Sequence, residues 1–445
     1  MTNDIIVGLD IGTTKIACFV GQKQENGKVK ILGHGKTESR GVVSGAVLNI
    51  SDTTEDIKKA VGQASSMAEL DIRDVYVGVA GQHIKSYSSK GTMMISPDQP
   101  YITEEDVKAL TEQQYGISLL PGEEIIHLFP QTYFVDEQEL TNTMPRGVCG
   151  NKLDCIFHVV TGNTNSLRNI KNAVEEAGLR VKGLVLEPVA SSMAVLDATA
   201  LEAGVALVDI GGGTTDIAIF KDGIIRHTAV LPAAGNFITS CVKEGCNVMK
   251  SQAEGLKTRF GSCLPSQVSE DDYVSIPVYR GTPNKEISLR FLAEIIKVPT
   301  ETILEKVKYE IEKSGFAKSL IAGIILTGGG AQLKHIKDYA SFLMAEHVQL
   351  GLPNEHLDIS TKEELIHPMY ATAIGLLLYG IEQSEKKGSE PEDKTACIAD
   401  LPEPPEMEEE PAIPTTPEEP EPKKKRNPLN RAMDRFLAKF CSDDD

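Results

Sequence analysis

Two short turns in the chain combine aspartate, glycine and paired threonines, residue types that can hold phosphate groups. The first turn follows an apolar run and contains Asp10, Gly12, Thr13, Thr14 and Lys15. The second has more glycine and no lysine, and contains Asp209, Gly211, Gly212, Gly213, Thr214, Thr215 and Asp216. Backbone N–H groups and hydroxyls in such turns surround a concavity that suits phosphate oxygens. Because the aspartates can hold a hydrated Mg²⁺, we expect the turns to clamp a nucleotide triphosphate tail from two sides.

Neither turn fits the Walker pattern or the dinucleotide-binding fingerprint. Taken alone, each turn could be an ordinary hairpin whose glycines supply a positive φ angle. The matched repetition, Asp10 with Asp209 and Thr13 with Thr214, favours a binding site. A third cluster, Gly328 to Gly330, follows an apolar segment and would let a flat group such as adenine approach the backbone. A plain strand-to-helix connection is the alternative for this third cluster.

The turns lie in an internal duplication, because residues 7–20 recur as 206–220. Each copy predicts a strand, the turn and a second strand. A third strand, 28–33 or 224–229, follows an Asn-Gly or Asp-Gly pair that is typical of hairpins. Helices are predicted at 54–67 (after a Ser51-Asp52 cap), 163–177, 253–260 and 300–313, and strands at 75–79, 184–186 and 323–326. This alternation predicts an α/β fold with a mixed sheet in each half.

Composition excludes several classes of protein. The net charge of −19 weighs against unspecific binding to nucleic acid. The eight cysteines lack the paired spacing of zinc ligands, so we interpret them as buried thiols in a reducing cytoplasm. The first residues predict no secretory signal, and no apolar run approaches the length of a membrane-spanning helix.

Charge is arranged in blocks at the C-terminal end. Residues 384–426 are acidic and rich in proline, which predicts a disordered, extended linker. Residues 427–441 then predict an amphipathic helix. Its apolar face contains Leu429, Met433, Phe436, Leu437 and Phe440, and its basic residues are Arg431, Arg435 and Lys439. The helix spans only about 20 Å, so we expect it to lie on an anionic membrane surface. Docking on the protein's own core or on a partner is the alternative.

These motifs together resemble the actin-like ATPase superfamily, which includes DnaK-type chaperones, MreB and some sugar kinases. In that resemblance, 10–15 and 209–216 correspond to the two phosphate loops and 327–331 to the adenosine loop. Residues 185–194, with their Glu-Pro-x-Ala core, correspond to the first connecting helix. The resemblance implies that Glu187 orients the attacking water while Asp10 and Asp209 position the hydrated metal.

Within the superfamily, the stretches 231–236, 253–261, 292–296 and 368–377 resemble the FtsA family of bacterial cell-division proteins. The resemblance implies ribose contacts from Glu254 and Lys257, and places Gly235 and Asn236 near the phosphates. Lys285 and Arg290 become candidate contacts for the C-terminal tail of the tubulin-like protein FtsZ.

The resemblance also implies a duplicated actin-like fold with ribonuclease-H-like mixed sheets. The first half comprises residues 1–83 and 159–203 and is completed by 363–383. The second half comprises 204–235 and 316–362. Inserted subdomains are expected at 84–158 and 236–315.

The implied function is that of an ATP- and Mg²⁺-binding protein with at most slow ATPase activity. It would form filaments on the cytoplasmic face of the inner membrane at the division site and hold the FtsZ ring there through the terminal helix. Other division proteins would bind the first inserted subdomain. A small-molecule (sugar) kinase and a pilus-assembly ATPase of the same superfamily are the alternatives.

Overall fold

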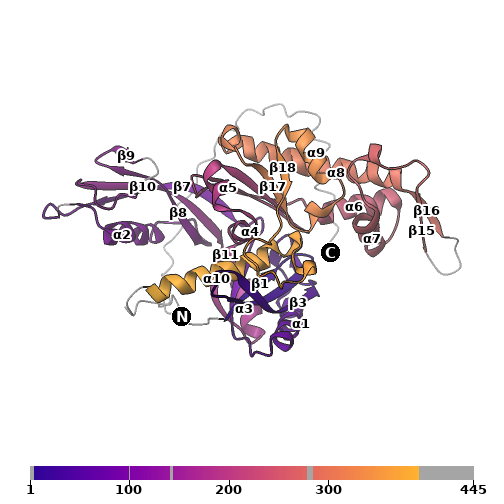
Figure 1. Cartoon of the computed structure of the whole chain (residues 1–445), viewed down its shortest axis with the longest axis horizontal. Helices are drawn as coiled ribbons and strands as arrows, with labels where there is room; N and C mark the ends of the chain where they lie inside the picture. Colours follow the sequence, from indigo (N-terminus) through magenta and orange to yellow (C-terminus); the bar gives the residue numbers. More distant parts are fainter. Residues whose placement is uncertain (1–4, 100, 141–143, 278–283, 390–445) are drawn as a thin grey trace, which may run out of the picture. The chain divides into compact units, whose positions relative to one another are not determined.

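The computed structural model describes residues 5–99, 101–140, 144–277 and 284–389, all within the first of the chain's two units, Met1–Pro391. Most of the expected acidic linker, and the expected membrane helix at 427–441, lie outside these residues. Two five-stranded sheets and two smaller insertions make up the part that is described (Figure 1).

The first half is a mixed sheet with strand order β11-β6-β1-β2-β3. Its strands are β1 (Ile5–Ile11), β2 (Lys15–Lys23), β3 (Val29–Glu38), β6 (Asp74–Val79) and β11 (Arg180–Leu186). The first three form the predicted antiparallel meander, β6 runs parallel to β1, and β11 runs parallel to β6. A short hairpin follows β3, and its strands β4 (Val42–Val43) and β5 (Ala46–Val47) have two residues each.

Helices cover both faces of this sheet. They are α1 (Ile50–Ala68) and α3 (Thr164–Glu176) on one face, and α4 (Glu187–Val195) and α10 (Ala371–Ser389) on the other. Side chains of β1 alternate accordingly, with Val7 and Leu9 in the α1 and α3 core and Ile6 in the α10 core. Gly8 allows α10 to lie directly on the strand, since a Cβ there would be 2.6 Å from the Ala373 carbonyl oxygen.

The second half repeats this sheet, with order β14-β13-β12-β17-β18. Its strands are β12 (Val205–Ile210), β13 (Thr215–Lys221), β14 (Ile224–Leu231), β17 (Gly323–Thr327) and β18 (Val348–Leu350). Helices α8 (Leu289–Lys313) and α9 (Ile336–Met344) pack on one face, and α5 (Ala198–Ala203) on the other. An antiparallel meander joined to two parallel strands therefore occurs twice, as the duplicated sequence predicts.

Each half carries an insertion. The first is a four-stranded sheet, β7-β10-β8-β9, with a helix on it. Its elements are β7 (Lys85–Met94), α2 (Glu104–Tyr115), β8 (Glu123–Val135), β9 (Gln138–Leu140) and β10 (Lys152–Asn163). The second consists of α6 (Gly235–Cys246), α7 (Lys250–Phe260) and the hairpin β15 (Tyr273–Ile276) and β16 (Lys285–Ser288).

Several helices begin earlier than predicted. The side chain of Asn49 caps α1 by accepting a hydrogen bond from the backbone N–H of Asp52, so the expected Ser51-Asp52 cap is wrong. Helix α8 begins eleven residues before Thr300 and contains Pro299. Proline removes a helical hydrogen bond, but the buried face of α8 continues on both sides of it, through Leu292 and Ile303.

Helix α10 covers the expected start of the acidic linker. It continues past Ser384, where the linker was expected to begin. Its last turns form an ion pair between Glu382 and Lys386 at 2.6 Å and a second between Glu385 and Lys23 of β2 at 2.5 Å. Pairs of this kind support a helix after its apolar pattern has ended.

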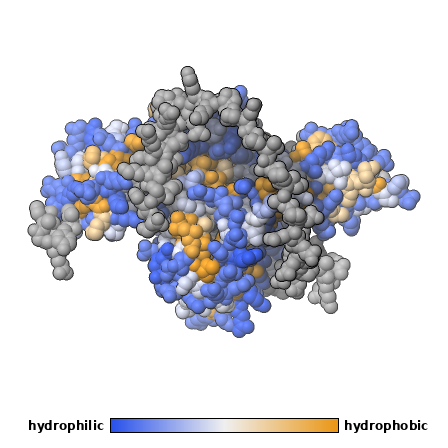
Figure 2. Space-filling model, turned by 180° about the vertical axis from the view of Figure 1, so that it is seen from behind, coloured by the Kyte–Doolittle hydropathy of each residue, from blue (hydrophilic) through white to orange (hydrophobic). Residues whose placement is uncertain are grey.

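The surface is mainly hydrophilic, with apolar side chains in separate patches, as the face in Figure 2 shows. Exposed apolar residues such as Ile321, Phe342 and Ile359 are scattered along the second half and its junction with the first. None of the helices in the described residues is long and apolar enough to cross a bilayer.

Candidate functional site

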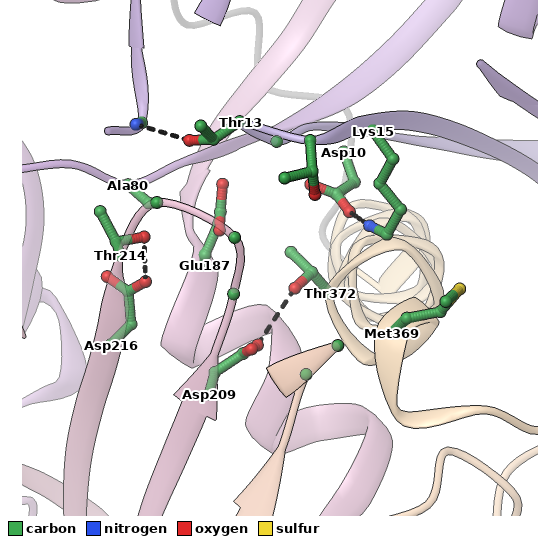
Figure 3. A pocket seen from close by; sticks show the side chains of 18 of the residues that line it. Asp10, Thr13, Lys15, Ala80, Glu187, Asp209, Thr214, Asp216, Met369 and Thr372 are labelled. Carbon is green, nitrogen blue, oxygen red and sulfur yellow. Dashed lines mark hydrogen bonds and ion pairs between the residues drawn. The ribbon is translucent and has the colours of Figure 1, made fainter. Parts of the chain in front are cut away.

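A cavity of about 110 Å³ lies where the two meanders meet (Figure 3). The predicted residues that line it are Asp10, Gly12, Thr13, Thr14, Lys15, Glu187, Asp209, Gly211, Gly212, Gly213, Thr214, Asp216, Gly328 and Gly329. The β1–β2 turn, the β12–β13 turn, the residues after β17 and the start of α4 supply these side chains. The structure therefore gathers predicted residues from four separate segments of the sequence at one site.

The two turns have the same backbone geometry. The N–H of Gly12 donates to the carbonyl of Lys15 at 3.0 Å, and the N–H of Gly211 donates to the carbonyl of Thr214 at 2.9 Å. The Thr13 hydroxyl also accepts a hydrogen bond from the N–H of Gly45 at 3.0 Å, which ties the first turn to the β4–β5 hairpin. The duplication thus extends to the hydrogen bond that closes each turn.

Close approach, rather than backbone conformation, requires the glycines. None of Gly12, Gly211, Gly212 and Gly213 has a left-handed φ angle, so the simple hairpin explanation does not account for them. A Cβ on Gly212 would be 2.3 Å from Cγ2 of Thr14, and one on Gly213 would be 2.6 Å from Oγ1 of Thr13. Any larger residue at these two positions would push the turns apart.

The cavity is strongly acidic. Lys15 forms an ion pair with Asp10 at 2.5 Å, and although burial opposes it, this carboxylate keeps the pKa of Lys15 above its ordinary value. Burial raises the pKa of Glu187 well above its ordinary value, and Asp10, Asp216 and Asp209 raise it further. Placing these carboxylates together is unfavourable in the free protein, so the site favours a bound cation.

Asp209 is held by hydroxyls from two helices. The Ser191 hydroxyl of α4 donates to Oδ2 of Asp209 at 2.7 Å, and the Thr372 hydroxyl of α10 donates to the same oxygen at 3.3 Å. The two hydroxyl oxygens lie 3.0 Å apart. Burial raises the pKa of Asp209, while the bond from Ser191 opposes this rise. The network joins the second phosphate turn to two helices of the first half.

Asp216 offers a free oxygen to the cavity. Thr214 donates to its Oδ2 at 2.9 Å, and its buried Oδ1 has no hydrogen-bond partner among the described residues. Nor do three His, Cys, Asp or Glu side chains in this part of the chain converge into a direct metal site. Mg²⁺ usually keeps several of its waters. These carboxylates therefore fit a hydrated Mg²⁺ that they contact through water.

The nucleotide-free protein should lose stability as the pH rises. Burial, and next the charge of Asp209, raise the pKa of Asp216 from 3.8 to about 7. The unfolded chain ionises this group first, so its contribution to stability is full below about pH 4 and is lost as the pH rises to about 7. Asp216→Asn should remove up to about 4 kcal/mol of this decline, since one pKa unit corresponds to about 1.4 kcal/mol.

Urea unfolding between pH 4 and 8, in EDTA and without nucleotide, measures the effect. Asp71→Asn is the control, because Asp71 is exposed and pairs with the exposed Arg73. Equal pH slopes for wild type and Asp216→Asn would contradict the assignment.

Four other predicted residues pack or form hydrogen bonds at or next to the β12–β13 turn, outside the cavity lining. Thr215 is buried and donates its hydroxyl to the carbonyl of Ala233 at 2.7 Å. The N–H groups of Gly235 and Asn236, at the start of α6, donate to the carbonyls of Gly211 and Gly212 at 3.1 and 2.8 Å. Gly330 packs against Ile210, where a Cβ would meet Cγ2 at 2.4 Å. None of the four lines the cavity.

Glu254 and Lys257 lie on α7 and do not line the cavity. They form an ion pair at 2.8 Å. The Lys257 ammonium group also donates to the carbonyl of Gly235 at 3.0 Å and to the Thr239 hydroxyl at 2.9 Å. Lys257 therefore links α7 to the start of α6 and, through Gly235, to the second turn.

Neither Lys285 nor Arg290 lines the cavity; Lys285 lies in the second insertion, and Arg290 follows it in α8. Lys285, at the start of β16, donates to the carbonyl of Cys246 at 2.6 Å, the last residue of α6. Arg290, in the first turn of α8, pairs with Glu270. Both side chains already have partners within the chain.

Several residues of the site are not among those predicted from the sequence. Gly45, Ala80, Pro368, Met369 and Thr372 line the cavity, and Ser191 holds Asp209. Ser191 and Thr372 lie within the stretches 185–194 and 368–377, which resemble the family. No spacing rule pairs these two residues, because they are 181 positions apart.

Comparisons with known proteins support one family. The family model "Cell division protein FtsA" matches residues 206–375, "SHS2 domain inserted in FTSA" matches 81–161, and "Hsp70 protein" matches 163–230. A protein named cell division protein FtsA from Pseudomonas aeruginosa is 33% identical over 404 residues, which are 91% of this chain and 96% of the relative. Its namesake from Escherichia coli K12 is 35% identical over 385 residues, 85% of this chain and 90% of the relative.

Solved structures share the fold at lower identity. A chain of the PilM-PilN type IV pilus biogenesis complex matches with a TM-score of 0.62 and 15% identity, over 85% of this chain and 99% of that one. MreB5 of Spiroplasma citri, solved with ADP bound, matches with a TM-score of 0.52 and 15% identity. The match covers 87% of this chain and 99% of that one. The predicted actin-like fold is confirmed.

Proposed function

The chain belongs to the FtsA family of cell division proteins, and we propose that it binds ATP with Mg²⁺ and links FtsZ to the membrane. One observation carries the nucleotide part of this proposal. Two turns with the same hydrogen bond, one from each half, face each other across an acidic cavity. Family membership favours this function over a sugar kinase or a pilus-assembly ATPase.

We assign the phosphate contacts to the two turns. N–H groups of the β1–β2 and β12–β13 turns and the Lys15 ammonium group would bind phosphate oxygens, and Asp10, Asp209 and Asp216 would hold Mg²⁺ through water. A bound Mg²⁺ would neutralise charge on the phosphates. The two turns contact each other at Gly212 and Thr14. Contacts of both turns with the terminal phosphate would bias the closure of the two halves, which makes the nucleotide state a switch between conformations.

Glu187 is our candidate for orienting the attacking water. Its carboxylate faces the cavity between Asp216 and Asp10 in Figure 3. Partial neutralisation of its neighbours by a cation would lower its pKa and restore the ionised form. In that form one oxygen can accept a hydrogen bond from water and align it with the terminal phosphate.

Glu187→Gln tests this assignment. We expect ATP hydrolysis to fall at least about 10-fold, because the amide cannot take a proton from water. ATP affinity should change by less than about 3-fold, since the substitution keeps the shape of the side chain. Single-turnover hydrolysis of labelled ATP over hours gives the rate, and equilibrium dialysis gives the affinity.

Glu202→Gln, on the exposed surface of α5, is the matched control. Unchanged hydrolysis in Glu187→Gln would remove Glu187 from this role, and loss of ATP binding would reassign it to binding.

The membrane and partner assignments depend on the family and on sequence. We propose that residues 427–441 bind the cytoplasmic face of the inner membrane as an amphipathic helix, and that the acidic linker gives the helix its reach. The FtsZ tail would bind the second insertion, where acidic groups of the peptide could replace Glu270 as the partner of the exposed Arg290. Self-association into filaments, and binding of other division proteins to the first insertion, complete the proposal.

A further inference from the structure

The first insertion touches the nucleotide-binding half at an exposed strand edge. Strand β11 is the outermost strand of its sheet, so the N–H groups on its free side have no strand partner. Strand β8 of the insertion contacts β11 there. At the last residue of β11, the N–H of Leu186 donates to Nε2 of His127 at 3.1 Å. A side chain of the insertion thus takes the place of a neighbouring strand.

This hydrogen bond lies directly before the candidate catalytic residue Glu187. Leu186 directly precedes Glu187, which is the first residue of α4. Among the described residues, no side chain caps the start of α4 by a hydrogen bond. Glu187 also fits tightly over β6, since a Cβ on Gly78 would be 3.1 Å from its Cγ. A small shift of Leu186 would therefore move the Glu187 carboxylate.

His127 is well suited to hold one position. Its ring packs against Phe129 of β8, with centroids 5.3 Å apart, and edge-on against Tyr379 of α10 at 6.4 Å. Burial lowers the pKa of His127 to about 4. At neutral pH the imidazole is uncharged, and because Nε2 accepts the bond from Leu186, the proton resides on Nδ1.

We propose that His127 is a positioning residue through which the first insertion sets the place of Glu187 in the nucleotide site. The inference rests on the proposed function, in which Glu187 orients water. The insertion is then a structural part of the ATPase site, in addition to a surface for other proteins. Displacement of β8 would alter hydrolysis without touching the nucleotide.

Two substitutions separate positioning from general packing. His127→Phe keeps an aromatic ring of similar size and removes the acceptor, whereas His127→Gln restores an acceptor oxygen at similar reach. His158→Phe is the matched control. His158 lies on β10 of the same insertion, its Nε2 contacts the Thr228 hydroxyl of the second half at 3.0 Å, and burial likewise lowers its pKa to about 4.

The experiment measures amide hydrogen exchange of peptides covering residues 180–195, together with single-turnover ATP hydrolysis and ATP affinity of the full chain. Losing one hydrogen bond corresponds to a change of about 5- to 10-fold. His127→Phe should therefore increase exchange at Leu186 and slow hydrolysis by about that factor, with ATP affinity within about 2-fold. His127→Gln should restore both, and His158→Phe should leave both unchanged.

Two results would overturn the proposal: unchanged exchange in His127→Phe, or equal defects in His127→Phe and His127→Gln. If the wild-type chain binds no ATP, the proposed function fails. The exchange measurement still decides in that case whether His127 holds Leu186.

Discussion

Asp209→Asn is expected to weaken binding of Mg²⁺–ATP by about 10- to 100-fold, the loss typical of removing a residue that orients a metal's ligands. The carboxylate belongs to the second phosphate turn, and the Ser191 and Thr372 hydroxyls both point their protons at its Oδ2. An amide keeps the shape and one acceptor oxygen, but it removes the charge that would bind the hydrated metal.

The same substitution should leave the fold intact. Burial raises the pKa of Asp209, so the folded, nucleotide-free protein disfavours the charged form. A neutral side chain of equal size removes that penalty, and the melting temperature without nucleotide should stay equal or rise. Loss of binding combined with retained stability is the pattern expected of a functional residue, because functional sites keep unfavourable charges for their ligands.

Titration calorimetry with Mg²⁺–ATP and thermal unfolding of the free protein measure the two effects. Asp222→Asn is the matched control. It removes a carboxylate just past the other end of β13, where Asp222 pairs with Arg226. Unimpaired ATP binding by Asp209→Asn would refute the assignment of the cavity, and a lower melting temperature would show that Asp209 is structural.

Truncation after Ser389 is expected to abolish binding to anionic vesicles. The described residues contain no helix able to cross a bilayer, and we assign membrane binding to residues 427–441. Each basic residue near an anionic surface contributes about 1 kcal/mol. Removing the basic residues and the apolar face of this segment should therefore lower vesicle binding by at least about 100-fold.

Co-sedimentation with vesicles of anionic and of neutral lipid measures this loss. Cutting after Ser389 keeps α10 complete, including the pair between Glu385 and Lys23. Nucleotide binding therefore serves as the folding control. Phe436→Glu in the full chain should reproduce most of the loss through one apolar position. Equal sedimentation of full and truncated chains would place the membrane contact elsewhere.

The sequence predicted the repeated part of the fold well. Both meanders and the two similar turns follow from local signals, namely β-branched runs, Asn-Gly and Asp-Gly pairs, and a repeat that aligns Asp10 with Asp209. The resemblance to a known superfamily added Glu187, and the structure brings all of these residues to one cavity.

Long-range pairing could not be predicted in the same way. Ser191 and Thr372 meet at Asp209 only because α4 and α10 cross closely, where a Cβ on Gly375 would collide with the Ala190 carbonyl. The predicted starts of α1 and α8 were wrong for a related reason. Asn49 caps α1 by one specific hydrogen bond, and the buried face of α8 outweighs Pro299. Each outcome depends on tertiary contacts that periodicity does not encode.

We propose that this chain connects FtsZ to a membrane, and one co-sedimentation experiment can show this connection. A labelled peptide with the sequence of the FtsZ C-terminal tail is mixed with anionic vesicles, Mg²⁺–ATP and either the full chain or the chain cut after Ser389. The peptide should sediment with the vesicles only when the full chain is present. Sedimentation that is equal with the truncated chain, or absent with the full chain, would contradict the proposal.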